Sequence, residues 1–212
     1  ADHDRMAHAL RLAERGLFTT TPNPRVGCVI VKDGRIIGEG WHCRFGSPHA
    51  EVEALRACKS NPRGATCYVT LEPCNHHGKT PPCTDALIAT GIARVVAAIR
   101  DPNPIVDGDG FAKLRRAGIR VDVGVCAEQA AELIAPFATR MLHQRPYVIA
   151  KWAQSLDGKL ATRTGESKWI SGEQSRRRVH QLRARVDAIL VGSGTVLKDD
   201  PRFRAQMEIV RK

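Results

Sequence analysis

The chain has 212 residues, 42% of them apolar and 26% charged, a composition typical of one large or two small globular domains that excludes collagen and a disordered chain. No apolar run approaches the about 18 residues of a membrane-spanning helix, and the first residues lack an apolar signal-peptide segment, so we expect no membrane partner. The net charge of +11 invites a nucleic-acid interpretation, but aromatic residues make up only 5%, which argues against a base-stacking surface.

The first two thirds of the chain alternate between predicted strands and helices. Apolar residues at helical spacing predict a helix over residues 4–15. Two predicted strands, 26–32 and 35–41, flank the dipeptide Asp33-Gly34, which is a strong hairpin signal. The pattern then predicts helices at 48–59, 82–90 and 110–117, and strands at 65–71, 94–99 and 119–123. This alternation indicates an α/β domain in which helices cover a mixed sheet.

A boundary is predicted at Arg145-Pro146. Before it, a helix over residues 127–143 contains Pro136 and should kink there. After it, the pattern predicts strands at 147–153 and 188–191, and a helix that Ser171 opens in a capping box and that extends to about residue 186. We therefore expect one domain over 1–144 and a second over 145–212. The second segment is too short for an independent enzyme domain, so we expect it to be the N-terminal part of a larger one.

Seven cysteines occur along the chain, at positions 28, 43, 58, 67, 74, 83 and 126. Their odd number and wide spacing favour reduced, buried thiols over a disulfide framework, and we expect a reducing compartment, the cytoplasm. Two of them differ from this pattern, because Cys74 belongs to the run Glu72-Pro73-Cys74 directly after a predicted strand and Cys83 comes nine positions later.

One histidine and these two cysteines form the predicted metal site. His49, Cys74 and Cys83 are the three-ligand set of a catalytic zinc ion with an open fourth position. Glu51 lies two residues after His49, in the H-x-E arrangement in which the glutamate moves protons and does not bind the metal. Zinc lowers the pKa of bound water towards about 7, and a nearby carboxylate accepts its proton and passes it to the leaving amine.

Two other interpretations of these residues stay open at this point. In the first, which is purely structural, His49 caps a helix, and Cys74 and Cys83 are thiols of the core. The second alternative has His76 or His77 replacing Cys83 as a ligand, because eight residues separate the two cysteines where zinc deaminases usually have two.

Several motifs make the chain similar to the bifunctional riboflavin-biosynthesis deaminase/reductase family. They are TPNPRVG at 21–27, PHAEV at 48–52, TLEPCNHHGKTPPC at 70–83, DPNP at 101–104, AQSLDGK at 153–159 and GESKWI at 165–170. The resemblance runs from about residue 4 to 203 in order, and the eight-residue insertion between the cysteines is one of its marks. The tail after Phe203 does not align with the family.

The resemblance implies a fold, two reactions and two cofactors. The fold is a cytidine-deaminase-like three-layer α/β/α domain followed by part of a dihydrofolate-reductase-like α/β domain. The first domain would use one zinc ion to deaminate 2,5-diamino-6-ribosylamino-4(3H)-pyrimidinone 5′-phosphate by hydrolysis. The second would use NADPH to reduce the ribosyl group of 5-amino-6-(5-phosphoribosylamino)uracil. The expected partners are thus phosphorylated pyrimidine nucleotides, and we expect a homo-oligomer, a dimer or a tetramer.

The resemblance also assigns substrate residues to the deaminase, namely Asn23, His42, His76, Lys79 and Asn103. Asn23 stands between two prolines, where a fixed amide offers an acceptor and two donors to a pyrimidine edge, although a turn-forming asparagine fits as well. Lys79 in a GKTPP loop is a natural partner for the substrate phosphate, and a free surface lysine is the alternative.

For the reductase, the resemblance implies NADP contacts at Ala153, Thr195 and Asp199. It implies substrate contacts at Ser167, Trp169, Arg183 and Phe203. A guanidinium such as that of Arg183 can bind a phosphate with two hydrogen bonds. Trp169 is open to a plain core role.

The rival function is a deaminase acting on a base in tRNA or single-stranded DNA, which shares the H-x-E and P-C motifs. The charge distribution argues against it. Residues 1–144 contain 18 basic and 15 acidic residues, whereas residues 145–212 contain 15 and 7. The excess around Arg176, Arg177 and Arg178 fits a solvent-exposed helix face or the anionic nucleotides, so we expect no nucleic-acid partner. A non-enzymatic module stabilised by zinc is the third possibility.

Overall fold

The structure is a computed structural model that describes residues 1–77, 81–104 and 106–201. Contacts divide it into two compact units, Ala1–Tyr147 and Val148–Lys212. The sequence predicted a boundary three residues earlier, and that assignment of domains stays a prediction.

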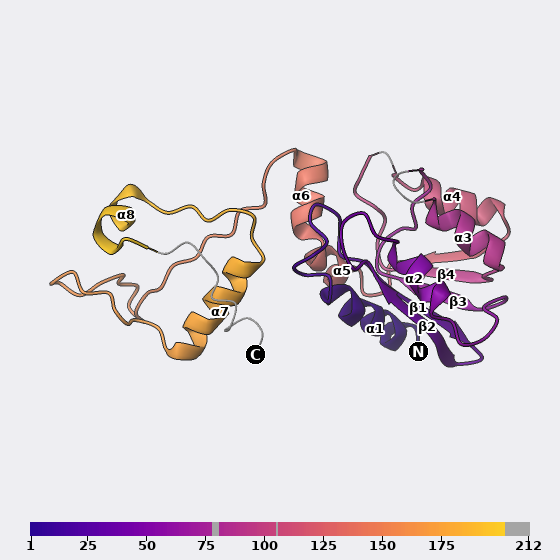
Figure 1. The fold of residues 1–212 in the computed structure, drawn as a ribbon, viewed down its shortest axis with the longest axis horizontal. Coiled ribbons are helices and arrows are strands. Elements are labelled where there is room, and N and C mark those ends of the chain that lie inside the picture. The colour runs from indigo at the N-terminus through magenta and orange to yellow at the C-terminus, as the bar shows by residue number, and fades with distance from the viewer. Residues whose placement is uncertain (78–80, 105, 202–212) are drawn as a thin grey trace. The chain divides into compact units, whose positions relative to one another are not determined.

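The first unit is built on a five-stranded mixed sheet of order β2-β1-β3-β4-β5 (Figure 1). The strands are β1 (Gly27–Lys32), β2 (Arg35–Trp41), β3 (Thr66–Val69), β4 (Arg94–Ala97) and β5 (Arg120–Val123). The hairpin strands β1 and β2 pair antiparallel, as do β1 and β3, whereas β3, β4 and β5 run parallel. All five predicted strands of this unit are present, some of them shorter than predicted.

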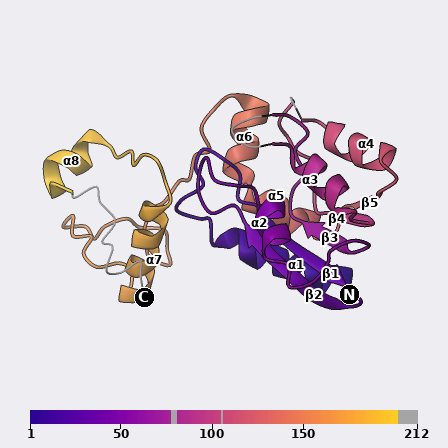
Figure 2. The same ribbon diagram turned by 45° about the vertical axis from the view of Figure 1, so that its right-hand side comes forward.

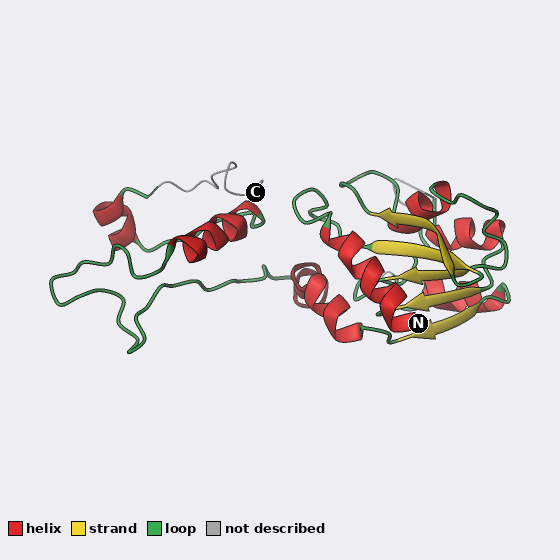
Figure 3. Ribbon diagram, turned by 90° about the horizontal axis from the view of Figure 1, so that it is seen from below, coloured by secondary structure: helices red, strands yellow, loops and turns green. Residues whose placement is uncertain are grey.

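Helices cover both faces of the sheet (Figures 2 and 3). On one face, α1 (Asp2–Glu14) and α5 (Ala127–Leu133) enclose a buried cluster that includes Met6, Val29 and Val96. On the other face, α2 (Ala50–Arg56), α3 (Cys83–Thr90) and α4 (Asp109–Arg116) enclose a second cluster that includes Leu87 and Leu114. The predicted three-layer α/β/α architecture is therefore confirmed.

A close backbone contact seats α2 against the sheet. A Cβ atom on Gly40 of β2 would lie 2.3 Å from the backbone nitrogen of Ala54 and 2.4 Å from the carbonyl oxygen of Ala50. Only a residue without a side chain allows α2 to approach β2 so closely. Because His49 directly precedes α2 and Glu51 lies in its first turn, this contact fixes the position of both residues.

The prediction of a single kinked helix over 127–143 is wrong. The segment forms two helices, α5 and α6 (Ala135–His143), separated at Ile134. Pro136 lies in the first turn of α6, where its missing N–H has no partner to lose. The chain therefore breaks before the proline and does not bend at it.

The second unit contains α7 (Glu173–Ala184) and α8 (Ser193–Asp199). The strands predicted at 147–153 and 188–191 are wrong for this structure, because no described residue of this unit is in a strand. A strand needs hydrogen-bonded neighbours, and here apolar side chains such as Val148 (81% exposed) and Leu190 (97% exposed) stay open. The capping box at Ser171 is also wrong, since Gly172 precedes α7 and no side chain caps it.

Candidate metal and substrate site

Three short segments of the first unit bring the predicted metal ligands together. His49 is the residue directly before α2, Cys74 lies in the loop after β3, and Cys83 is the first residue of α3. Cys74 and Cys83 are buried and His49 is half-buried. The predicted site thus forms where the loop after a central strand meets the N-termini of two helices on one face of the sheet.

The three side chains point their donor atoms at one another. Nδ1 of His49 lies 3.4 Å from Sγ of Cys74 and 3.3 Å from Sγ of Cys83. All three ligand atoms lie within 4.8 Å of one another, and they form the only such group of histidine, cysteine and acidic residues in the described part of the chain. His76 lies nearby but outside this group, so the geometry favours Cys83 over His76 as the third ligand.

This arrangement fits a zinc ion. Zn–S bonds of about 2.3 Å and Zn–N bonds of about 2.0–2.1 Å in a tetrahedron separate a sulfur from a nitrogen by about 3.5 Å. The two N–S distances, 3.3 and 3.4 Å, are close to that value. Two sulfurs and one imidazole leave one position of the tetrahedron for water or substrate, as in catalytic zinc sites.

Hydrogen bonds stabilise a thiolate at Cys74. The backbone N–H of Cys83 donates to Sγ of Cys74 over 3.4 Å. Hydrogen bonds from Cys83 and His49 lower the pKa of the Cys74 thiol to about 4, although burial opposes this. The neighbouring Cys74 and burial raise the pKa of the Cys83 thiol. The pair therefore already contains one ligand in the form that binds a metal.

Glu51 lies beside this group in a buried position, with 3% of its surface exposed. Burial, with a smaller contribution from the charge of Cys74, raises the pKa of Glu51 to about 7. A carboxyl group with a pKa near neutrality can both accept and donate a proton.

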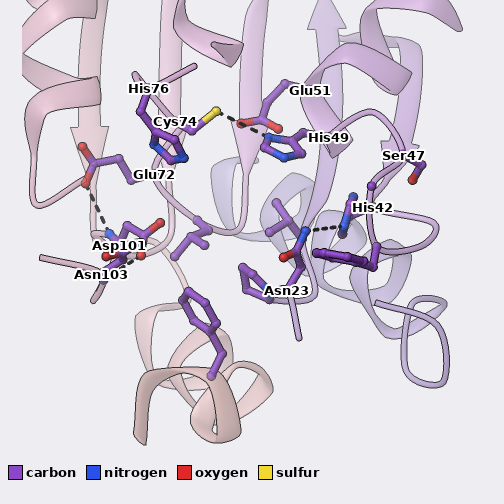
Figure 4. Close-up of a pocket in the computed structure, with 16 residues that line it drawn as sticks. Asn23, His42, Ser47, His49, Glu51, Glu72, Cys74, His76, Asp101 and Asn103 are labelled. Atoms are coloured by element: carbon purple, nitrogen blue, oxygen red, sulfur yellow. Dashed lines mark hydrogen bonds between the residues drawn. The ribbon is translucent and has the colours of Figure 1, made fainter. Parts of the chain in front are cut away.

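A pocket of about 280 Å³ opens in front of these residues (Figure 4). Its walls contain His49, Glu51 and Cys74 together with four of the five predicted substrate residues. Those four are Asn23, His42, His76 and Asn103. The fifth, Lys79, lies outside the described residues. The aromatic rings of Phe45 and Phe137, which the sequence did not single out, also line the pocket.

The hydrogen bonds of His42 orient the amide of Asn23. Nδ1 of His42 lies 3.2 Å from the carbonyl oxygen of Pro48, and a carbonyl accepts, so Nδ1 carries the proton. Burial lowers the pKa of His42, which favours the neutral ring, and Nε2 is then an acceptor. The Nδ2 amide of Asn23, 3.1 Å away, donates to it. Asn23 therefore offers its carbonyl oxygen to the pocket.

Sequence reasoning assigned no role to two further acidic residues of the pocket, Glu72 and Asp101. Both are buried. Burial, with a smaller contribution from Glu72, raises the pKa of Asp101 to about 6. A charged residue between a buried strand and a metal-binding cysteine was the available signal for Glu72.

The residues predicted for the reductase lie in the second unit, apart from Phe203, which lies outside the described residues. Ala153 is half-buried before a turn, and Thr195 and the backbone of Asp199 belong to α8. Trp169 is 71% exposed, with the guanidinium of Arg176 stacked over its ring at 4.5 Å. Ser167 is exposed, and Arg183 is half-buried on α7. Their roles stay predictions.

Two family models match the chain. The cytidine and deoxycytidylate deaminase zinc-binding region matches residues 1–99, and the RibD C-terminal domain matches residues 146–211. The first match contains all three predicted metal ligands and Glu51. None of the helices in the described residues has the length and hydropathy to span a membrane.

Curated relatives match nearly the whole chain. The chain is 56% identical over 202 residues to the riboflavin biosynthesis protein RibD of Aquifex aeolicus, and 58% identical over 196 residues to that of Escherichia coli. These matches cover 95% and 92% of this chain but only 57% and 53% of the relatives. The chain thus spans little more than half the length of the curated relatives that it matches.

A solved structure extends the similarity to three dimensions. A diaminohydroxyphosphoribosylaminopyrimidine deaminase/5-amino-6-(5-phosphoribosylamino)uracil reductase from Thermotoga maritima matches with a TM-score of 0.92 and 49% identity. That match covers 98% of this chain and 60% of the other. With its zinc-deaminase region, its RibD C-terminal region and relatives of this identity over nearly its whole length, the chain belongs to the RibD family of riboflavin biosynthesis proteins.

Proposed function

We propose that the first unit deaminates 2,5-diamino-6-ribosylamino-4(3H)-pyrimidinone 5′-phosphate by hydrolysis and releases ammonia. The observation that carries the proposal is the buried carboxyl group of Glu51 beside a His49–Cys74–Cys83 group at the floor of a pocket. The Thermotoga maritima relative is named a diaminohydroxyphosphoribosylaminopyrimidine deaminase, which is the same substrate class.

His49, Cys74 and Cys83 would hold the zinc ion. When bound, zinc supplies a Lewis acid that lowers the pKa of water to about 7. The protein's own contribution is Glu51, which takes the proton of the attacking water and gives a proton to the nitrogen of the leaving amine. Its burial keeps this carboxyl group away from bulk solvent, and its pKa of about 7 suits a group that must do both.

The pocket residues orient the ring. The carbonyl oxygen of Asn23 would accept a hydrogen bond from an N–H of the pyrimidine, while the neutral ring of His42 keeps that amide in place. His76 and Asn103 also line the pocket and would contact the substrate, and Lys79 would bind its phosphate.

We propose further that the second unit is part of an NADPH-dependent reductase that reduces the ribosyl group of the deaminated product. Its match to the RibD C-terminal domain supports this assignment. The cofactor would contact Ala153, Thr195 and Asp199, and the substrate would contact Ser167, Trp169, Arg183 and Phe203.

The assembly and compartment are part of the same proposal. We propose a homo-oligomer, a dimer or a tetramer, in the cytoplasm. Exposed apolar side chains such as Leu156 and Leu190 support association, and the free thiols of all seven cysteines support a reducing compartment. Sedimentation equilibrium of the zinc-loaded protein tests the assembly, and a single monomeric mass at all concentrations would contradict it.

Ammonia release from the diaminopyrimidine nucleotide by the zinc-loaded protein tests the deaminase. We expect release with the wild type and a loss of at least about 100-fold with Glu51→Gln, which keeps the shape of the side chain but cannot take up a proton. A zinc-loaded wild type that releases no ammonia would contradict the proposal. Release from tRNA with a steep dependence on salt would instead favour the rival function.

A further inference from the structure

Glu72 is a buried carboxylate on the wall of the pocket, and four backbone N–H groups donate to it. Oε2 accepts from Asp101 over 3.2 Å and from Gly108 over 3.1 Å. Oε1 accepts from Gly110 over 3.0 Å and from Phe111 over 3.2 Å. The last two residues belong to the first turn of α4, and Gly108 precedes that helix. One side chain thus binds both ends of the segment between β4 and α4.

This set of bonds occupies the carboxylate fully. An ionised carboxylate has about four acceptor positions, and Glu72 uses four. Its charge is stabilised by backbone dipoles, including those at the N-terminus of α4. Although Glu72 lines the pocket and lies two residues before Cys74, it has no acceptor left for a metal ion or a substrate. Glu72 can therefore affect the pocket only by holding in place the segment to which it is hydrogen-bonded.

That segment carries two pocket residues. Asp101, which lines the pocket, accepts the backbone N–H of Asn103 at its Oδ1 over 2.8 Å, so the two residues form one turn. Asn103 also lines the pocket. The position of this turn relative to the metal site is set where α4 meets the loop that carries Cys74. There, a Cβ atom on Gly110 would lie 2.0 Å from the carbonyl oxygen of Pro73, so the two backbones touch.

We propose that Glu72 is a positioning residue for the substrate: it connects the loop that carries Cys74 to the turn that carries Asp101 and Asn103. The metal ligand Cys74 lies on the loop, and the pocket residues Asp101 and Asn103 lie on the turn. If the hydrogen bonds between loop and turn are weakened, substrate binding should therefore suffer far more than the rate of the chemical step. The kinetic part of this inference rests on the proposed deaminase function, whereas the structural part does not.

The substitution Glu72→Gln tests the connection directly. A glutamine keeps one carbonyl oxygen and replaces the other with an NH2 group, which cannot accept a hydrogen bond. One of the two pairs of backbone N–H groups then loses its acceptor. Amide hydrogen exchange of the zinc-loaded full chain should accelerate at least about tenfold at Asp101 and Gly108 or at Gly110 and Phe111. The amides of β3 and β4 should keep their protection.

Steady-state kinetics separate positioning from a general loss of structure. We expect Glu72→Gln to raise the KM for the diaminopyrimidine nucleotide at least about tenfold, to change kcat less than about threefold, and to leave one zinc ion per chain. In a double-mutant cycle with Asn103→Ala, the double variant should be no worse than the more damaging single variant, because both changes remove the same contact. The matched control is Glu53→Gln on α2, where the carboxylate pairs with Arg56 outside the pocket; it should change none of these quantities.

Unchanged exchange at all four amides, or KM effects of Glu72→Gln and Asn103→Ala that multiply independently, would overturn the inference. If Glu72→Gln does not fold, Glu72→Asp replaces it under the same criteria, because it keeps the charge but sets the carboxylate back by one methylene. A wild type without deaminase activity would contradict the proposed function, and the exchange measurement would still decide the role of Glu72.

Discussion

The Nδ2 amide nitrogen of Asn23 lies 3.1 Å from Nε2 of His42 at the edge of the pocket. Since the other ring nitrogen of His42 donates to the carbonyl oxygen of Pro48, the ring can only accept from Asn23. The hydrogen-bonding group that Asn23 offers to a substrate is therefore decided by a residue nineteen positions away and not by Asn23 itself.

This relationship predicts the effect of His42→Phe. Phenylalanine fills a similar volume but cannot accept the Asn23 amide, which then turns freely. We expect the KM for the diaminopyrimidine nucleotide to rise about tenfold, equivalent to about 1.4 kcal/mol and thus to one hydrogen bond. Steady-state kinetics measure this, with His8→Phe as the control, because His8 pairs with Glu39 and does not line the pocket. Equal KM values for His42→Phe and the wild type would show that the amide needs no partner.

Removal of zinc should separate activity from folding. None of the three ligands belongs to the two apolar clusters of the first unit, which are formed by other side chains such as Leu87 and Val96. We expect a strong chelator to abolish ammonia release and to leave the far-ultraviolet circular dichroism unchanged, because a core of this size does not depend on the metal. Unfolding on chelation would mean that the metal stabilises the fold. If the chain stays folded, added zinc should restore ammonia release.

Lys79→Ala should discriminate between substrates. If Lys79 binds the phosphate, its loss lowers kcat/KM for the phosphorylated substrate by about tenfold or more and leaves kcat/KM for a dephosphorylated analogue nearly unchanged. The ratio of kcat/KM for the two compounds measures this in wild type and variant. Equal losses with both compounds would remove the phosphate role of Lys79.

The pH dependence of stability should show an ion pair between α1 and the sheet. The carboxylate of Asp2 lies 2.8 Å from the guanidinium of Arg94 and accepts the hydroxyl of Tyr68 over 2.7 Å. Hydrogen bonds from Arg94 and Tyr68 lower the pKa of Asp2 to about 2. A pKa that is lower in the folded state stabilises the fold above the ordinary value of about 4 and ceases to do so as the pH falls towards 2.

We therefore expect Asp2→Asn to reduce the free energy of unfolding by about 0.5–1 kcal/mol at pH 7, a modest value because the pair is partly exposed. The difference from the wild type should shrink as the pH falls from about 4 to 2. Urea unfolding at several pH values measures it. Asp4→Asn is the control, since Asp4 lies in the same helix turn but is 84% exposed. A difference of the same size at pH 2 would show that the effect does not come from the charge of Asp2.

The local sequence was enough to predict most elements of the first unit and the ligands of the metal site. The pattern of apolar residues predicted every strand and nearly every helix of the first unit, because that pattern marks the face of each element that is buried in the core. The metal ligands were also readable, since His49 with Glu51 and Cys74 with Cys83 combine residue types that only a few chemistries use.

Tertiary structure alone decided the features that depend on distant partners. The carboxylate oxygens of Glu72 accept hydrogen bonds from backbone N–H groups 29 to 39 positions away. Every residue except proline has such an N–H group, so the sequence does not show which of them will donate to Glu72. Residues 147–153 and 188–191 have the apolar composition of strands, yet they are not strands, because a strand exists only beside a hydrogen-bonded neighbour. Composition and spacing thus determined the elements and the chemistry at the metal, whereas the wall of the pocket was determined by which backbone each buried polar side chain meets.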